Sequence, residues 1–186
     1  MLATGQPKYI WVGMMVLAVG TMQWVDAMIW YRKSRGESSV GWSQIGVPTV
    51  LSLEIIVGYL GYIYYFQKRM PAYEPIIGLM VLGIFYLFQR DCQESSIDKD
   101  GYLVWCGAQS VTQNYVARMA ERTAIMFFIF FPFFFFPDVG FKLLILGTGL
   151  GLWLYTVLSD SFGARWCQSF FIVDIVILAK LFLLDR

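Results

Sequence analysis

Residues 9–30 read YIWVGMMVLAVGTMQWVDAMIW, a long apolar run that ends shortly before Arg32. Residues 45–66, IGVPTVLSLEIIVGYLGYIYYF, have the same character and end shortly before Lys68. A helix needs about 20 mostly apolar residues to cross the hydrocarbon of a bilayer, and both runs meet that length. These two stretches therefore predict membrane-spanning helices, and further apolar runs follow them along the chain.

The composition of the whole chain favours a membrane over water as its surroundings. Hydrophobic residues make up 58% of the 186 residues and charged residues 15%, whereas an ordinary soluble domain is roughly 25% charged. The net charge is +1 and there is no basic tail or stripe, so no nucleic-acid partner is predicted. The chain has no histidine, which excludes imidazole-ligated metal and haem sites and histidine-dependent catalytic dyads.

The spacing of the apolar runs predicts an all-α, polytopic helical membrane protein with a single transmembrane domain over 1–186. The expected spans are about six, at 9–30, 45–66, 73–88, 123–136, 139–158 and 164–184. Between 102 and 122, apolar residues recur at helical spacing, which predicts an amphipathic interfacial helix or an extension of the fourth span. Six spans place both termini on the same side. The compartment is open, with an organelle inner membrane as the working expectation.

Three carboxylates interrupt the predicted spans: Asp26, Glu54 and Asp174. A charged side chain at the centre of a bilayer costs roughly 2.5–3.5 kcal/mol on the insertion scale, so each acid is expected to face protein. Counted along the helices, all three fall in the same half of the membrane, and Gln23 lies one turn from Asp26 as a donor. We predict that these four residues form a buried polar cluster. It would serve either as hydrogen-bonded links between helices or as a path for a cation or proton.

Small residues and phenylalanines mark the predicted contact surfaces. Gly20 and Ala27 on the first span are typical of close helix packing, as is the Gly-x-x-x-Gly pair of Gly147 and Gly151. The fourth span is crowded with phenylalanines, which favours contact with lipid or a partner subunit. They include Phe127, Phe128, Phe130, Phe131, Phe134 and Phe135. No metal or cofactor is predicted. Bound lipids are expected, with a pigment or quinone as the alternative occupant.

Three short segments carry a family resemblance. They are MQWVDAMIW at 22–30, DGYLVW at 100–105 and FGARWC at 162–167. In order and approximate spacing they resemble an uncharacterised multi-pass membrane protein family of large DNA viruses and protists, whose first helix carries Gln, an acid three residues on and Trp four further. That family usually has a Gln-Pro pair in its second helix, where this chain has Leu53-Glu54. The resemblance implies a compact multi-helix topology and supplies no activity.

The residues leave three functions open. The first is a non-catalytic structural or accessory subunit of a larger membrane protein complex, such as an energy-converting one, with membrane lipids and other membrane subunits as partners. The second is a small ion, proton or solute transporter or channel that uses the buried carboxylates. The third is a lipid-modifying membrane enzyme, for which Glu121 and Arg122 would supply the interfacial polar groups. We favour the first, which is not an enzyme.

Overall fold

A computed structural model describes residues 7–66, 73–89, 94–105, 115–131, 134, 139–159, 161–169 and 175. The fold is all-α, with a small two-stranded hairpin inserted between its two halves. The helices are α1 (Pro7–Ser34), the π-helical turn η2 (Trp42–Gly46), α2 (Val47–Phe66), α3 (Glu74–Gln89), α5 (Tyr115–Phe130) and α6 (Val139–Thr156). Residues 162–169 are also helical. Strands β1 (Ser96–Ile97) and β2 (Leu103–Val104) pair antiparallel, with Ser96 opposite Val104.

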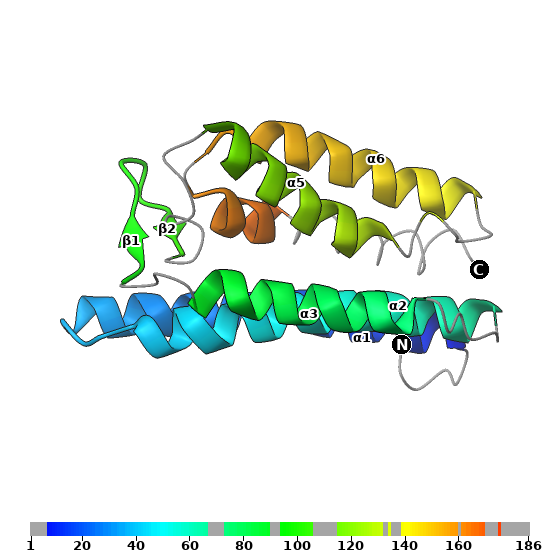
Figure 1. Ribbon diagram of the computed structural model, residues 1–186, viewed down its shortest axis with the longest axis horizontal. Helices are drawn as coiled ribbons and strands as arrows, with labels where there is room; N and C mark the ends of the chain where they lie inside the picture. The colour runs from blue at the N-terminus through cyan, green and yellow to red at the C-terminus, as the bar shows by residue number, and fades with distance from the viewer. Residues whose placement is uncertain are drawn as a thin grey trace.

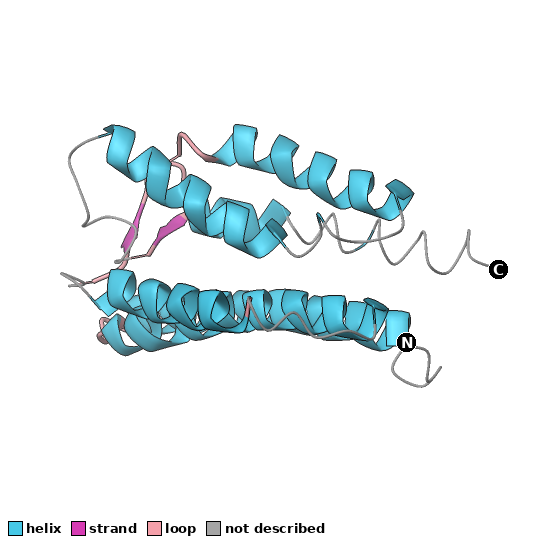
Figure 2. Cartoon of the chain, turned by 45° about the vertical axis from the view of Figure 1, so that its right-hand side comes forward, coloured by secondary structure: helices cyan, strands magenta, loops and turns pink. Residues whose placement is uncertain are grey.

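The helices lie in two layers (Figure 1). One layer contains α1, α2 and α3, and the other contains α5 and α6, with α2 meeting α5 across the interface. The view in Figure 2 keeps the same separation into layers. The β1–β2 hairpin stands at one end of the long axis, at the end where α1 finishes and α2 begins. The hairpin is therefore placed to touch both layers.

The first layer is held by close packing of α1 on α2. The indole N–H of Trp11 donates to the carbonyl of Val57 at 2.9 Å. Gly61 makes this possible, because a Cβ added there would lie 1.8 Å from the indole nitrogen. Further along α1, apolar side chains three or four residues apart are buried on one face: Ala18, Met22, Val25 and Ile29. Helices α1 and α2 thus pack along one row of apolar side chains, and the hydrogen bond of Trp11 holds the N-terminal end of α1 against α2. We call this row, together with Trp11 and Gly61, the apolar seam.

The first helix ends in a glycine cap. Gly36 has φ +69°, a left-handed conformation that glycine adopts without steric cost. The N–H of Gly36 donates to the carbonyl of Lys33 at 3.0 Å, and the N–H of Glu37 donates to that of Arg32 at 3.0 Å. This is the Schellman pattern, which satisfies the free carbonyls at a helix C-terminus. It turns the chain directly back toward α2.

Four helices begin and end within a few residues of predicted spans. They are α1, α2, α3 and α6, for which 9–30, 45–66, 73–88 and 139–158 were expected. The first turn of the second run is the π-helical η2 rather than part of α2. Of the sixth predicted span, 164–184, residues 164–169 are helical, and most of the remainder lies outside the described residues.

The predicted helix over 102–122 is wrong in its first part. Leu103 and Val104 form β2, and α5 begins only at Tyr115. The physical reason lies just upstream, where Gly101 has φ +85° and closes a tight turn that leads the chain into a strand. Of the residues whose spacing predicts this helix, Val104 lies in β2, where both residues are buried. The alternative of an extended fourth span describes 115–122 better, since these residues open α5.

The fourth span is also shifted from its predicted position of 123–136. Helix α5 ends at Phe130, two residues before Pro132 in the sequence. Proline disfavours the α-helical conformation in the residue that precedes it, which accounts for an α-helix that ends at Phe130. The polar residues of 115–122 and the phenylalanines that follow therefore share one helix.

Two stretches of the described chain are long and apolar enough to cross a membrane. They are Gly13–Ser34 in α1 and Trp42–Gly61 in η2 and α2. Glu74–Tyr86 and Lys142–Thr156, in α3 and α6, are shorter apolar helices. The length and composition of the helices thus indicate membrane association most clearly for the first layer.

Candidate functional site

The most elaborate polar structure in the described chain is the hairpin turn between β1 and β2. The carboxylate of Asp98 accepts through Oδ1 from the backbone N–H of Asp100 at 2.9 Å and of Tyr102 at 2.8 Å. The N–H of Asp98 donates to the carbonyl of Tyr102 at 2.8 Å. Aspartate is favoured in such turns because its side chain satisfies backbone donors two to four residues on. The turn is therefore held by hydrogen bonds within itself, independently of its contacts with the helices.

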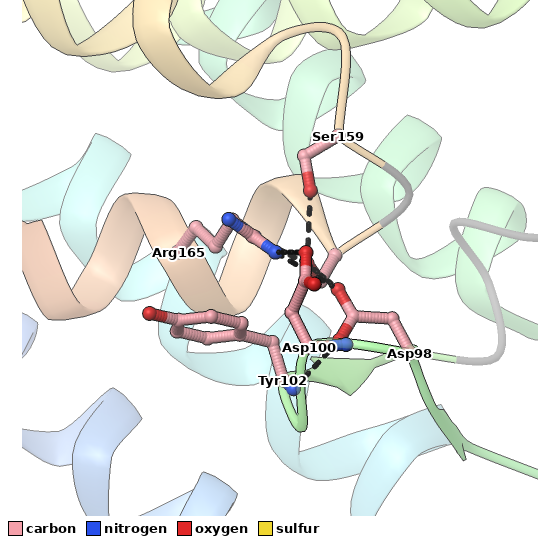
Figure 3. A network of polar contacts seen from close by, with 6 residues as sticks. Asp98, Asp100, Tyr102, Ser159 and Arg165 are labelled. Carbon is pink, nitrogen blue, oxygen red and sulfur yellow. Dashed lines mark hydrogen bonds and ion pairs between the residues drawn. The ribbon is translucent and has the colours of Figure 1, made fainter.

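The same aspartate fastens the turn to the start of the C-terminal helical segment (Figure 3). Its Oδ2 accepts from the hydroxyl of Ser161 at 2.5 Å and from Nη2 of Arg165 at 3.3 Å. Nη2 of Arg165 also donates to Asp100 Oδ2 at 2.6 Å, and the guanidinium carbon lies 4.0 Å from the ring centroid of Tyr102. We call this set, Asp98, Asp100, Tyr102, Ser161 and Arg165, the hairpin clamp.

The hairpin clamp changes the acidity of Asp98. Partial burial alone would raise the pKa of this carboxyl, whose side chain is 12% exposed. Hydrogen bonds from Ser161, from the Tyr102 N–H and from Arg165 outweigh that effect and lower the pKa from 3.8 to about 2. Asp98 is therefore charged throughout the physiological range, and the clamp is built around its negative charge.

The other flank of the hairpin is tied to the turn between α1 and α2. The carboxylate of Glu94 accepts from both the N–H, at 3.0 Å, and the hydroxyl of Ser39. Burial would raise the pKa of Glu94, but the hydrogen bonds from Ser39 and Ser38 and the charge of Lys33 lower it. Lys33 itself donates to the carbonyl of Ser95 at 2.5 Å. The hairpin thus bridges the two helical layers.

Below the hairpin, Trp105 reaches a carboxylate inside the bundle. Its indole N–H donates to Asp26 Oδ1 at 2.8 Å, and the side chain is buried. A Cβ added at Gly163 would lie 2.1 Å from Cζ3 of this indole, so the ring fits against a bare stretch of backbone. Its centroid lies 6.2 Å from that of Phe88. Trp105 is therefore wedged between α1, α3 and the helical segment 162–169.

Two of the predicted buried acids come together around a cysteine. Glu54 is 3% exposed and Cys167 is 2% exposed. The carboxyl groups of Glu54 and Asp26 both lie close enough to the Cys167 thiol to act on it electrostatically. The structure thus brings Asp26 and Glu54 to one region between the layers, together with a thiol that the sequence did not single out. Asp174 lies outside the described residues.

Gln23 is not placed as predicted. Its side chain is exposed on the outer face of α1, and Trp105 supplies the donor to Asp26 instead. Gly20 and Ala27 are exposed on the same outer face, and a Cβ added at Gly20 would meet nothing within 4 Å. The reason is helical geometry, because the inner face of α1 is already filled by its apolar seam. Among the residues that the structure describes, none packs closely against Gly20.

The glycine of α6 that allows close helix packing is not one of the predicted pair, Gly147 and Gly151. A Cβ added at Gly147 or Gly151 would meet nothing within 4 Å, whereas one at Gly149 would lie 2.5 Å from Cζ of Phe130. Gly149 points to the opposite side of the helix from the other two. Within the described chain, the close approach between α5 and α6 is therefore made at Gly149, and the Gly147–Gly151 stripe faces outward.

The phenylalanines around the end of α5 also divide between inside and outside. Phe127 and Phe134 are exposed, as expected for lipid or partner contact, and Phe131 is half-buried. Phe130 is buried, with its ring centroid 5.6 Å from that of Trp166, so it belongs to the core rather than to the outer surface. The side chain of Phe128 and the whole of Phe135 lie outside the described part of the chain.

Arg122 is not an interfacial residue. It is buried, and its Nη1 donates to the carbonyl of Val157 at 2.6 Å. Its guanidinium carbon lies 5.4 Å from the ring centroid of Phe162. Arg122 thus joins α5 to the turn that follows α6. The side chain of Glu121 lies outside the description, and Arg122, the other residue of the predicted pair, is buried rather than at the surface.

No site role was predicted for Asp98, Trp105, Ser161, Arg165 or Glu94, although Trp105 and Arg165 lie in two of the segments that carry the family resemblance. A signal for the turn was present, because Asp98-Lys99-Asp100-Gly101 is a typical turn sequence. Nothing local in the sequence indicates that Asp98 reaches a serine and an arginine more than sixty residues away. Among the residues that the structure describes, no three or more Cys, Asp or Glu side chains are grouped so that they could hold a metal ion.

Comparison with known proteins adds no identity. No family model, no curated protein and no solved structure matches this chain. The resemblance to the family of large DNA viruses and protists accordingly stays a prediction.

Proposed function

We propose that this chain is a multi-pass membrane protein of about six spans that acts as a non-catalytic structural subunit of a larger membrane assembly. The proposal has two parts, lipid as the surrounding medium and a partner helix on one face. Each part is supported by a different set of exposed residues.

Lipid surroundings are supported by the outer faces of α3 and α6. Leu79 and Leu82 on α3 are 69% and 67% exposed, and Leu143 and Leu150 on α6 are 66% and 58% exposed. On each helix these leucines lie at helical spacing along one side. In water such stripes would be a large apolar patch, which soluble monomers rarely expose. In hydrocarbon they incur no such cost, so α3 and α6 are proposed to span the membrane together with α1 and α2.

The position of the polar groups supports the same orientation. The ion pairs of Glu37 with Arg32 and Arg35, at 3.4 and 3.2 Å, lie in the turn after α1. The hairpin stands at that same end of the layers (Figure 1). We place this end at the membrane surface, where charged groups keep contact with water, and we place the long axis of the bundle across the bilayer.

One observation supports the subunit role, namely that the side chain of Gln23 is exposed on the outer face of α1. Its amide lies on the outer face of α1 between the exposed Gly20 and Ala27, close to Trp24, which is 63% exposed. An amide facing lipid loses its hydrogen bonds with water, and small residues one turn away on either side allow another helix to approach closely. We propose that this face receives a transmembrane helix of a partner subunit, which supplies the hydrogen-bond partner.

The test is the mass of the native complex in a mild detergent. The unaltered protein is expected to migrate with partner subunits, and Gln23→Leu is expected to release a measurable fraction without changing its own thermal unfolding. Thr21→Val is the matched control, because Thr21 is exposed elsewhere on α1 and its hydroxyl already donates to the Leu17 carbonyl at 2.7 Å. A protein that is monomeric in every mild detergent would overturn the subunit role.

A second candidate, a proton or cation path, is favoured by the arrangement of Asp26 and Glu54. Both carboxyl groups lie within electrostatic reach of Cys167 in the interior, and acids inside a membrane protein commonly mark such paths. Purified protein in liposomes would show flux that is lost in Glu54→Gln. Flux that is absent, or that survives this substitution, would leave the acids as links between helices.

A further inference from the structure

We propose that the hairpin and Trp105 form a releasable plug that closes the carboxylate of Asp26 from water at the polar end of the bundle. The plug opens when the hairpin clamp lets go of the C-terminal helical segment. This inference goes beyond the proposed subunit role and does not depend on it.

Trp105 is a buried residue that connects the hairpin to the interior of the bundle. Its ring lies against the backbone of Gly163, and its one polar atom donates to Asp26. On its far side the chain leads directly into the hairpin, since β2 ends at Val104. Movement of the hairpin would therefore withdraw the indole and expose the Asp26 carboxyl.

The attachments of the hairpin are reversible in chemical character. On one flank Asp98 and Asp100 bind Arg165 and Ser161, and on the other Glu94 binds Ser39. All are hydrogen bonds or ion pairs at the polar end, where Asp100 is half exposed to solvent. Such contacts exchange readily with water, whereas the apolar seam of α1 and α2 does not. Of these two kinds of contact, the polar attachments of the hairpin are thus the less costly to break.

Cys167 provides a built-in reporter of the plug. It lies one helical turn after Gly163, and residues four apart lie on the same face of a helix. Cys167 is therefore on the face of the helical segment that the Trp105 ring covers at Gly163. Because the thiol is buried in the closed state, its reaction with a water-soluble maleimide measures how often the plug is withdrawn.

The experiment uses the full chain with Cys92→Ser and Cys106→Ser, so that Cys167 is the only thiol. Two substitutions open the plug from opposite sides. Asp98→Asn weakens the hairpin clamp, and Gly163→Ala pushes a methyl group into the space of the Trp105 ring. Each is expected to raise the rate of maleimide labelling about tenfold, the size expected when a charged hydrogen bond or a tight contact is lost.

Each variant has a matched control. Glu37→Gln removes a carboxylate at the same end that pairs with Arg32 and Arg35 and not with the hairpin. Gly147→Ala adds a methyl group where nothing lies within 4 Å. Both controls should label at the rate of the parent. Helical content by circular dichroism and a single gel-filtration peak identify the variants that remain folded.

The proposal is overturned if folded Asp98→Asn and Gly163→Ala label no faster than the parent, or if the two controls accelerate labelling equally. Where Asp98→Asn is not recovered folded, Ser161→Ala removes a single hydroxyl from the clamp and tests the same step. A smaller acceleration in Ser161→Ala than in Gly163→Ala supports the plug, and none in either rejects it.

Discussion

Two regions hold the bundle together by different interactions. One is the apolar seam between α1 and α2, and the other is the hairpin end. In the seam, Trp11 fits into the space left by Gly61, and a row of apolar side chains follows it along α1. At the hairpin end, aspartates and an arginine join segments from distant parts of the chain. Close packing of side chains stabilises the seam, and ion pairs and charged hydrogen bonds stabilise the hairpin end.

A bundle that lies in a membrane, as proposed above, divides its stabilising contacts between two environments. Lipid tails are as apolar as leucine, so burial alone does little to hold two helices together, and close packing must do it. At the surface, water and salt screen charges, so single ion pairs there are worth little and the hairpin uses several together. A firm apolar seam and a weaker polar end follow from these two environments.

The largest effect is expected in the seam, from Gly61→Ala. The added methyl group would overlap the Trp11 indole and disturb its hydrogen bond to Val57. Overpacking of a tight core contact typically costs about 1–3 kcal/mol. Unfolding in a detergent series should show this loss, while Gly20→Ala, at an open site on the same bundle, should be neutral or slightly stabilising. Equal stability of the two variants would remove the distinction drawn for the seam.

A smaller effect is expected at the hairpin end from Ser39→Ala. This change removes the hydroxyl that donates to Glu94 and leaves the backbone N–H bond intact. Since Glu94 is solvent-exposed, the loss should be about 1 kcal/mol. Ser38→Ala should cost less, because its hydroxyl lies 3.3 Å from the same carboxylate. Thermal unfolding of the three proteins measures the order, and a reversed order would contradict the assigned contacts.

A further effect is expected only in acid, where Asp98 becomes protonated. Its pKa is lowered from 3.8 to about 2, so folding favours the charged form. The stabilisation is therefore complete above pH 3.8 and is lost as the pH falls toward 2. Exchange of the Asp100 and Tyr102 amide protons should quicken over that window in the parent relative to Asp98→Asn. An identical pH dependence in both proteins would show that Asp98 is not the group involved.

The helices of the first layer could be predicted because their signal is local. Apolar runs such as 9–30 and 45–66 show the length of each helix directly, because the hydrophobicity of each residue is known from the sequence alone. The prediction of the helix over 102–122 fails where the same apolar residues fit both a helix and a strand. Val104 fits a helical pattern as well as a strand, and it lies in β2 after the turn in which Gly101 is left-handed.

The candidate site was predictable only in part. Asp26 and Glu54 stood out because acids are rare in apolar runs, and both lie in the interior near Cys167. The partner of Asp26 could not be found, because Trp105 is 79 residues away and an apolar residue gives no sign of its indole N–H. The face of a helix that meets lipid also depends on its neighbours. That is why Gln23 and the Gly147–Gly151 pair were assigned to the inside.

The central claim is that the outer faces of the bundle meet lipid while the hairpin end meets water. Single cysteines in a cysteine-free background at Leu79, Leu150 and Lys99 test it directly in native membranes, with a membrane-impermeant maleimide applied from both sides. Leu79→Cys and Leu150→Cys should resist labelling until the membrane is dissolved and the chain unfolded, while Lys99→Cys in the hairpin turn should label at once. Rapid labelling of all three positions in intact membranes would contradict the account.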